Sequence, residues 1–502
     1  MAFFNKNKTD RHNSGRTTRW VSLGKTEAEG EKDGLKKYYD DILHISDAIY
    51  DGKFIITGRK GVGKSAYVQY LMNNSGHEKD LFCKVITNDA IDLEKIIQSV
   101  PEGVGNRDEI VYEWIILTGF VQLILQSEIG KYTNEYNSLE KFQKKNSGLV
   151  DVEKWMVLEE NVKDGYSVNF SSLLIKGFST FFSKDFSQKT MRAPFYKLIH
   201  PLREILAKMF GFQVYENCDF VLIFDDLDVN FNLNDINHKR RLLSLLRITK
   251  RYNTQIFTNK NVRVLNMLRD DISAQLDGVS PDKNKAFSSY EYNLNWYDFD
   301  KNGQETDTGL RKFINKRIKF AFDDLKIPYD RIDPWQTLVQ NDASEAYRGK
   351  TAFKYILDFT FYRPRDLVAL FRNISDKYYK MPLSPQDIKT LIKEYLPWNI
   401  AEIKDELSNL YNTMEIEKIF HVFRTMAVPN SQWTYSSILE IFTNEGLLEK
   451  DFNKMVEYNF IIPKSETNYQ YFSYREKPRI SRADNYFYCL PKCIYEYYND
   501  NI

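Results

Sequence analysis

The residues with the clearest chemical pattern are the eight consecutive positions 58–65, which have the sequence GRKGVGKS. They match the phosphate-binding pattern G-x-x-x-x-G-K-[ST]. Glycines let backbone N–H groups wrap around phosphate oxygens, and the N-terminus of a following helix adds partial positive charge. Lys64 is expected to reach the β- and γ-phosphates of a nucleoside triphosphate, and the Ser65 hydroxyl to ligate Mg²⁺. The residues predicted to bind the nucleotide are Gly58, Arg59, Lys60, Gly61, Val62, Gly63, Lys64, Ser65 and Ala66.

A second segment, residues 221–228 with the sequence VLIFDDLD, delivers acidic side chains at the end of an apolar run. This is a Walker B arrangement, in which Asp225 would hold the Mg²⁺ shell together with Ser65. Asp226 could orient or deprotonate the attacking water, and Asp228 competes with Asp226 for that role. The alternative is an acidic turn that caps the N-terminus of a helix. Ser65 and Asp225 are therefore the predicted metal ligands.

Two arginines occupy positions where a phosphate sensor could lie. Arg269 closes the apolar segment 264–268, and Arg365 opens a helix whose Pro364 suits the first turn. A cation at a helix start opposes the helix dipole unless an anion is near, which favours a functional role for Arg365. The alternative for Arg269 is an ion pair with Asp270 or Asp271, and the alternative for Arg365 is a salt bridge to Asp366 or elsewhere. Three more arginines either act across a subunit interface or lie on a solvated face: Arg240, Arg241 and Arg247.

The elements around these residues alternate between strands and helices. A short apolar run, 54–57, precedes the glycine-rich loop, and a helix is predicted over 64–72. Further strands are predicted over 83–86, 220–224, 262–265 and 292–296. This alternation predicts an α/β fold with a doubly wound parallel sheet, as in P-loop NTPases.

The remaining segments are predicted to be mostly helical. Asp225 lies 160 positions beyond Ser65, more than a plain βα repeat needs, so a helical subdomain is predicted to be inserted at about 105–210. The helices of this subdomain are predicted over 111–126, 170–182 and 194–210. Outside it, the first helix of the chain is predicted over 35–49. A helical lid at 301–400 is predicted to contain helices over 310–322, 352–360, 364–377 and 385–395.

The end of the chain has the element order of a winged-helix domain. Helices are predicted over 416–426, 435–442 and 449–458, followed by strands near Phe460 and Tyr471. The predicted domains are then a flexible polar tail at 1–20, a P-loop NTPase core at 21–300, the lid at 301–400 and a winged-helix-like domain at 401–502.

Composition excludes several classes of protein. The 70 Lys and Arg balance 69 Asp and Glu, so no global field draws the chain of 502 residues onto nucleic acid or anionic lipid. Four scattered cysteines are too few for a disulfide framework. We expect neither a signal peptide nor a segment apolar enough to span a bilayer. These observations predict a cytoplasmic protein without membrane contact.

Together, the phosphate loop, the segment DDLD, the segment LRDD at 268–271 and the segment RPRDL at 363–367 resemble those of bacterial STAND-like and KAP-like P-loop ATPases. More distantly, they resemble the origin-recognition branch of AAA+ ATPases. The likeness covers about residues 21–371. It implies ATP with Mg²⁺ as the ligand, metal and catalytic roles for Asp225 and Asp226, and a phosphate-sensor role for Arg365. Most AAA+ ATPases have glutamate where Asp226 stands, which leaves the base assignment and the hydrolysis rate open.

The resemblance also implies a biological setting, since such ATPases are often encoded in bacterial anti-phage defence and mobile-element loci, where they act with an effector. The first hypothesis is a nucleotide-driven regulatory switch that forms a homo-oligomer and assembles with a protein effector. The second is a loader or remodelling ATPase that contacts nucleic acid through its winged helix. The predicted recognition helix, 449–457, carries three acids against two lysines, which argues against phosphate contact. The third is a nucleotide-binding scaffold with little turnover.

Overall fold

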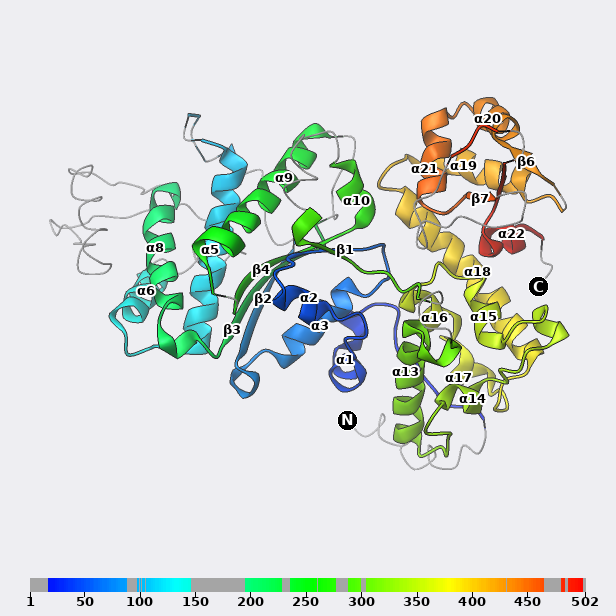
Figure 1. Ribbon diagram of the computed structural model, residues 1–502, viewed down its shortest axis with the longest axis horizontal. Helices are drawn as coiled ribbons and strands as arrows, with labels where there is room; N and C mark the ends of the chain where they lie inside the picture. Colours follow the sequence, from blue (N-terminus) through cyan, green and yellow to red (C-terminus); the bar gives the residue numbers. More distant parts are fainter. Residues whose placement is uncertain are drawn as a thin grey trace, which may run out of the picture. The chain divides into compact units, whose positions relative to one another are not determined.

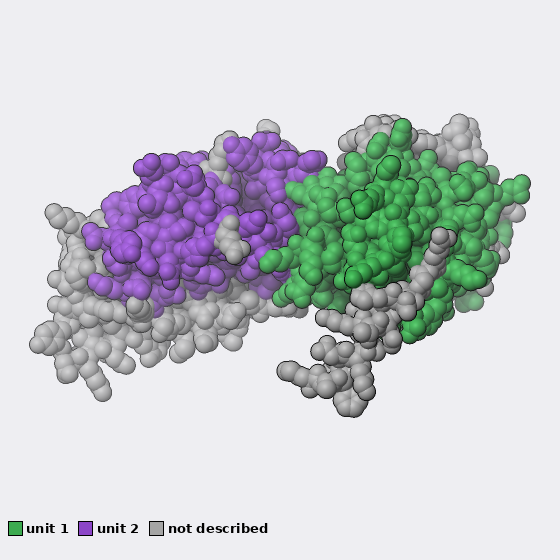
Figure 2. Space-filling model, turned by 90° about the horizontal axis from the view of Figure 1, so that it is seen from below, with its two compact units in different colours: residues 1–43, 59–63, 294–502 green, residues 44–58, 64–293 purple. Residues whose placement is uncertain are grey.

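The structure is a computed structural model that describes residues 17–87, 97–98, 100, 102–103, 105–145, 195–227, 235–259, 261–276, 288–298, 304–429, 431–464, 480–483 and 486–499. It divides into two units, coloured in Figure 2. Unit 1 comprises residues 1–43, 59–63 and 294–502, and unit 2 comprises residues 44–58 and 64–293. The chain therefore leaves unit 2 after Gly58 and returns to it at Lys64.

Unit 2 is built on a parallel sheet of five strands in the order β2-β3-β4-β1-β5. The strands are β1 (Ile55–Thr57), β2 (Leu81–Thr87), β3 (Asp219–Asp225), β4 (Val262–Leu268) and β5 (Glu291–Asn293). Every residue of β1 and β4 is buried, as expected for a parallel sheet covered on both faces. The predicted α/β fold with a parallel sheet is confirmed.

Helices cover both faces of this sheet (Figure 1). On one face, α5 (Arg107–Ser127) contacts β2 and β3, and α9 (Ile236–Arg251) contacts α5 and β4. Gly119 allows the close approach of α5, since a Cβ there would lie 2.8 Å from Leu222. On the other face, α3 (Lys64–Asn74) contacts β2 and β3. The remaining described α-helices of unit 2 are α2 (Ile45–Tyr50), α6 (Asn134–Lys145), α8 (Ile199–Phe210) and α10 (Asp270–Gln275).

Helix α5 corrects one expectation from the sequence. It is long and apolar enough to cross a membrane by length and composition alone, although no such segment was expected. However, 78% of its apolar window is buried inside the protein. Its apolar side chains therefore form the core between the sheet, α8 and α9, as in the central helix of a large α/β core.

Unit 1 is mainly helical over residues 309–426. Its α-helices there are α13 (Gly309–Leu325), α14 (Pro334–Leu338), α15 (Ala352–Leu357), α16 (Pro364–Leu370), α17 (Ile374–Lys377), α18 (Pro385–Leu407) and α19 (Thr413–Met426). Helix α18 packs against α15, α16 and α22 (Lys492–Asn499). A capping box formed by Ser384 and Asp387 fixes its start. Among the described residues, α18 is the longest helix of unit 1.

Two predicted helices are each divided in the structure. The helix predicted over 35–49 is α1 (Lys32–Tyr38) followed by α2, because Tyr39 is extended and His44 is left-handed. Asp40 and Asp41 after α1 are poor helix formers, because the aspartate side chain competes for nearby backbone groups. The helix predicted over 364–377 is α16 followed by α17, interrupted at residues 371–373.

The last part of unit 1 contains three helices and a small antiparallel sheet. After α19 come β6 (Trp433–Thr434), α20 (Tyr435–Asn444), α21 (Glu449–Glu457), β7 (Ile462–Lys464), β8 (Phe487–Cys489) and then α22. The strands pair in the order β6-β8-β7. The strand predicted near Tyr471 and the helix predicted over 170–182 lie outside the described residues.

Candidate functional site

The end of strand β3 meets the start of helix α3 inside unit 2. The Ser65 hydroxyl forms a hydrogen bond with the Asp225 carboxylate, and the positive charge of Lys64 acts on the same carboxylate. Lys64 Nζ donates to the carbonyl oxygen of Gly58 at 2.6 Å, which closes the loop on itself. The three side chains predicted to hold the metal and the phosphates therefore lie together, although 160 residues separate Ser65 from Asp225.

Asp225 is a buried acid with a perturbed pKa. Burial raises the pKa of its carboxyl to about 7, and the charge of Asp226 beside it acts in the same direction. Three groups lower this pKa and oppose the shift only in part: the backbone N–H of Asp226, the charge of Lys64 and the hydroxyl of Ser65. A strongly raised carboxyl pKa at the end of a buried strand is typical of a functional position.

The residues present fit a bound Mg²⁺ ion. A hydroxyl and a carboxylate oxygen are hard ligands of the kind that Mg²⁺ prefers, with the remaining positions taken by water and phosphate oxygens. A divalent cation would also stabilise the ionised form of Asp225, which burial otherwise penalises. Ser65 and Asp225 would hold the ion, and the ion would neutralise charge that develops on the phosphates. Among the described residues, no group of three or more His, Cys, Asp or Glu side chains could hold a metal by itself.

Replacing Asp225 by asparagine is expected to stabilise the protein in the absence of nucleotide and to remove its response to Mg²⁺ and ATP. The folded-state pKa is above the unfolded value, so ionisation of Asp225 lowers stability as the pH rises from about 4 to about 7. At about pH 8 the asparagine variant should be more stable by about 1–3 kcal/mol. Thermal denaturation with and without Mg²⁺ and ATP measures both effects. A variant that melts lower than wild type without ligand would contradict the burial argument.

The other predicted acids and Arg269 have different surroundings. Asp226 has a left-handed backbone with φ of 51°, which aspartate tolerates better than most residues. Asp228 lies outside the described residues. Arg269 is buried and donates to both oxygens of Asp271, from Nε at 3.0 Å and from Nη2 at 2.6 Å. This is the ion-pair alternative considered for Arg269, and it fixes the start of α10.

The three arginines on α9 lie in unit 2. Arg241 approaches the carboxylate of Asp108 on α5, with 4.0 Å between Nε and Oδ1. An interaction at this distance joins α9 to α5.

Unit 1 holds the middle of the phosphate loop by its backbone carbonyls. Arg363 Nη1 donates to the carbonyl of Lys60 at 3.1 Å, and Trp296 Nε1 donates to that of Val62 at 2.8 Å. The backbone N–H of Arg365 donates to the carbonyl of Gly61 at 3.4 Å. Gly61 has φ of 86°, and a Cβ there would lie 3.0 Å from the Cβ of Arg365. Glycine at this position therefore permits α16 to pack directly against the loop.

Two glutamates of α18 bind the basic side chains of the loop. Lys60 Nζ lies 3.3 Å from Glu402 Oε2, and Arg59 Nη2 lies 3.4 Å from Glu406 Oε2. Arg59 also donates to the carbonyl of Tyr458 at 2.7 Å. Arg59 and Lys60 therefore contact other parts of unit 1 rather than solvent alone.

Sequence reasoning missed the residues that hold the loop from unit 1: Trp296, Arg363, Glu402 and Glu406. The four-residue spacing of the two glutamates was the available clue, but the helix was predicted only over 385–395, whereas α18 continues to Leu407. It also missed Asn266 on β4, which is fully buried and whose side-chain oxygen and nitrogen have no hydrogen-bond partner. No sequence pattern marks a single asparagine within an apolar strand as a functional residue.

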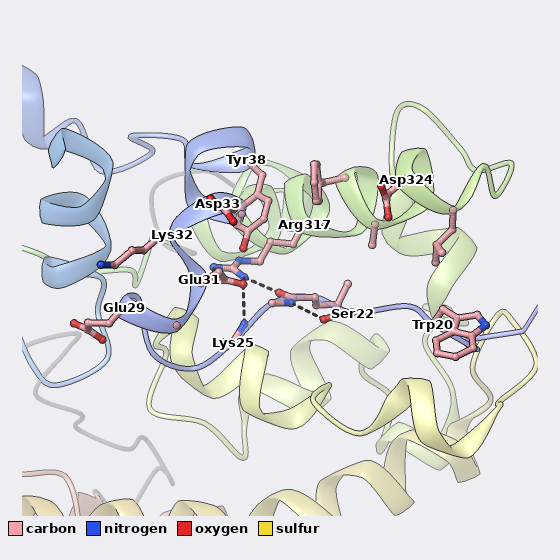
Figure 3. A pocket seen from close by; sticks show the side chains of 17 residues that line it. Trp20, Ser22, Lys25, Glu29, Glu31, Lys32, Asp33, Tyr38, Arg317 and Asp324 are labelled. Atoms are coloured by element: carbon pink, nitrogen blue, oxygen red, sulfur yellow. Dashed lines mark hydrogen bonds and ion pairs between the residues drawn. The ribbon is translucent and has the colours of Figure 1, made fainter. Parts of the chain in front are cut away.

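A cavity of about 500 Å³ lies within unit 1, beside the ion pair of Glu31 and Arg317 (Figure 3). Arg317 Nη2 lies 3.0 Å from Glu31 Oε2, and both side chains are 7% exposed. A Cβ at Gly24 would overlap this pair. Residues of the phosphate loop do not line the cavity. The cavity is therefore separate from the phosphate loop.

One part of the chain is similar to a known family. Residues 308–404 match the family described as the FunZ-associated C-terminal helical domain. This stretch contains α13 to most of α18 and so includes Arg363, Arg365 and Glu402. No curated protein matches the chain.

Among solved structures, Cdc6p from Pyrobaculum aerophilum is similar at 9% sequence identity, over 94% of this chain and 95% of that chain. The TM-score of 0.24 is too low to establish a shared fold. The P-loop core rests instead on the loop sequence, the parallel sheet and the pairing of Ser65 with Asp225.

Proposed function

We propose that this chain binds ATP with Mg²⁺ and hydrolyses it. The observation that carries the proposal is the hydrogen bond between the Ser65 hydroxyl and the Asp225 carboxylate, at the point where the phosphate loop ends. In this proposal the backbone N–H groups of the loop and Lys64 bind the phosphates. Water attacks the γ-phosphorus, the bond to the β-phosphate oxygen breaks, and Asp226 accepts the proton of the water. Asp228 is the other candidate for that base.

We further propose that ATP acts on this protein as a switch. Arg363, Arg365 and Trp296 bind three successive loop carbonyls, so the loop and the helical domain at 309–407 are connected by contacts within unit 1. A phosphate group that reorganises the loop would alter these contacts and bias the helical domain. The homo-oligomer, the protein effector and the anti-phage role remain predictions from the resemblance, and the cytoplasmic location remains a prediction from the composition.

The C-terminal part of unit 1 supports a protein contact over a nucleic-acid contact. We propose that α19, α20 and α21 with the sheet β6-β8-β7 form a winged-helix domain. Arg482, a described cation near the predicted wing, donates to Glu449 at 2.9 Å, and its Cζ lies 5.2 Å from the centre of the Tyr435 ring. Lys477 and Arg479 lie outside the described residues. An arginine already paired with an acid on the same domain offers less to a phosphate backbone.

The first experiment is ATP turnover by the purified protein, alone and with single-stranded or double-stranded DNA or RNA. We expect slow Mg²⁺-dependent turnover that nucleic acid does not change. Asp226→Asn should keep ATP binding and lower the turnover rate at least about 100-fold, because the general base is lost. Undiminished hydrolysis by this variant would move the base to Asp228 or elsewhere.

The same assay separates the alternatives. Strong stimulation by nucleic acid would favour the loader or remodelling ATPase, with the winged helix as its contact. Tight ATP binding without turnover in the presence of Mg²⁺ would favour the nucleotide-binding scaffold. The Lys64→Ala variant serves as the blank for contaminating ATPases.

A further inference from the structure

Helix α9 of unit 2 belongs to a stretch of the chain with an unusual charge (Figure 1). Residues 236–269 contain nine Lys and Arg and no Asp or Glu, although 70 basic and 69 acidic residues balance over the whole chain. The buried side of α9 consists mainly of leucine and isoleucine side chains, and the helix contacts α5 and β4. Six of the nine cations lie on α9 itself: Lys239, Arg240, Arg241, Arg247, Lys250 and Arg251.

Neighbouring acids neutralise only part of this charge. Arg251 Nη2 lies 2.5 Å from Glu113 Oε2, and Arg241 Nε lies 4.0 Å from Asp108 Oδ1, both on α5. Asp235 caps the N-terminus of α9. Six cations against these three acids leave a formal charge of +3 on the helix and its partners.

Three of the arginines form a line along the solvent side of α9. Arg240, Arg247 and Arg251 are separated by seven and by four residues, a spacing that places them on one face of a helix. Arg240 and Arg247 are exposed, and the side chain of Arg251 is 37% exposed. Ile236, four residues before Arg240, is 44% exposed and belongs to the same face. This arginine face therefore presents one apolar side chain at its start, followed by guanidinium groups over about four turns.

The charge and length of the arginine face suit an acidic protein segment better than nucleic acid. Proteins that bind duplex nucleic acid neutralise several phosphates, often about 6–10, whereas the excess here is +3 on a helix about 24 Å long. Carboxylates match the planar guanidinium group, as the pair of Arg251 and Glu113 illustrates. Ile236 in line with the arginines offers apolar contact, which a phosphate backbone does not use.

A second copy of this chain is a poorer match than a different protein. Among the described helices of eight or more residues, each one with at least two acids also carries Lys or Arg. Such mixed helices bring repulsion as well as attraction to a face that carries guanidinium groups. The match is better for a segment that is acidic throughout.

We propose that the arginine face of α9 binds a short acidic segment of a partner protein, with an apolar side chain at one end of that segment. This inference rests on the proposed function, because it assumes that the switch recruits a protein. Carboxylates of the segment bind Arg240, Arg247 and Arg251, and its apolar side chain packs on Ile236. Helix α9 begins 11 positions after Asp225 and leads into β4, so the partner is held between two neighbouring strands of the sheet.

The test is fluorescence anisotropy of a labelled, glutamate-rich peptide of about ten residues with one terminal leucine, added to the full chain. We expect a Kd on the order of 10 μM at about 50 mM salt, weakened at least about tenfold at about 300 mM salt. The double variant Arg240→Glu with Arg247→Glu should weaken binding at least about tenfold. Ile236→Ser should weaken it about threefold, because the contact with leucine is lost.

A matched control reverses two exposed lysines of α13, Lys312→Glu with Lys319→Glu, and so changes the net charge by the same amount. It should leave the peptide affinity within about twofold of wild type. Equal weakening by the two double variants would show non-specific attraction and overturn the inference. A wild-type Kd above about 1 mM would overturn it as well.

Two further measurements separate the other occupants of this face. A DNA oligonucleotide of the same charge should bind more weakly than the peptide, and tighter DNA binding that the α9 variant loses would assign the face to nucleic acid. Sedimentation velocity should show the same assembly for wild type and the α9 variant, and a loss of self-association would assign the face to a second copy. Either result would overturn the inference. Failure of the wild-type protein to bind ATP would instead overturn the proposed function, which peptide binding does not measure.

Discussion

Replacing Lys64 by alanine is expected to weaken ATP binding at least about 100-fold, to the point where no saturable binding is measurable. Lys64 Nζ donates to the Gly58 carbonyl in the structure, and its charge acts on Asp225. Its ammonium group is therefore held between the start of the loop and the end of β3. Isothermal titration calorimetry with ATP and Mg²⁺ measures the loss directly.

The control for this variant is Lys60→Ala, in the same loop four residues earlier. Lys60 is tied to Glu402 on α18, so its loss should change ATP affinity by less than about tenfold. Thermal denaturation should show that both variants fold. Tight ATP binding by Lys64→Ala would refute the assignment of the loop, whatever the behaviour of Lys60→Ala.

The sequence predicted the parts of the site that depend on local pattern. All five strands of the parallel sheet lie at or next to their predicted positions. β1 to β4 are mainly apolar runs bounded by turn residues, whereas β5 is a polar edge strand with the sequence EYN. The carboxyl ends of β1 and β3 lie at the same edge of a parallel sheet, so the loop after β1 and Asp225 at the end of β3 were expected to meet. Their hydrogen-bonded arrangement follows from that topology.

The sequence could not predict which distant residues hold the loop. Arg363 and Glu406 lie more than 300 positions beyond Arg59, and no local pattern indicates such a contact. Arg365 was predicted as a phosphate sensor, with a salt bridge to Asp366 or elsewhere as the alternative. Its carboxylate partner in the structure is Glu402, which no local pattern indicates. The ion pair of Arg269 with Asp271, by contrast, was one of the stated alternatives because the two residues are neighbours in sequence.

Replacing Arg363 by alanine is expected to cost about 3–5 kcal/mol of unfolding free energy, because it leaves buried carboxylates without a counter-charge. Arg363 binds Asp366 through Nε and Nη2 and Glu406 through Nη1. Burial alone would lower the pKa of its guanidinium, but Asp366 and Glu406 raise that pKa above its usual range. The side chain is therefore charged in the folded protein and stabilised by both acids.

Urea denaturation at neutral pH measures this loss, with Arg365→Ala as the matched control from the same helix. Arg365 is more exposed and pairs with the single carboxylate of Glu402, so its loss should cost about 1 kcal/mol. Adding Glu406→Gln to Arg363→Ala should recover part of the stability, since one of the uncompensated buried charges disappears. Equal losses for the two arginine variants would show that Asp366 and Glu406 do not depend on Arg363. The buried contacts of Arg363 would then be a consequence of how α16 packs on α18 rather than what fixes the helical domain on the phosphate loop.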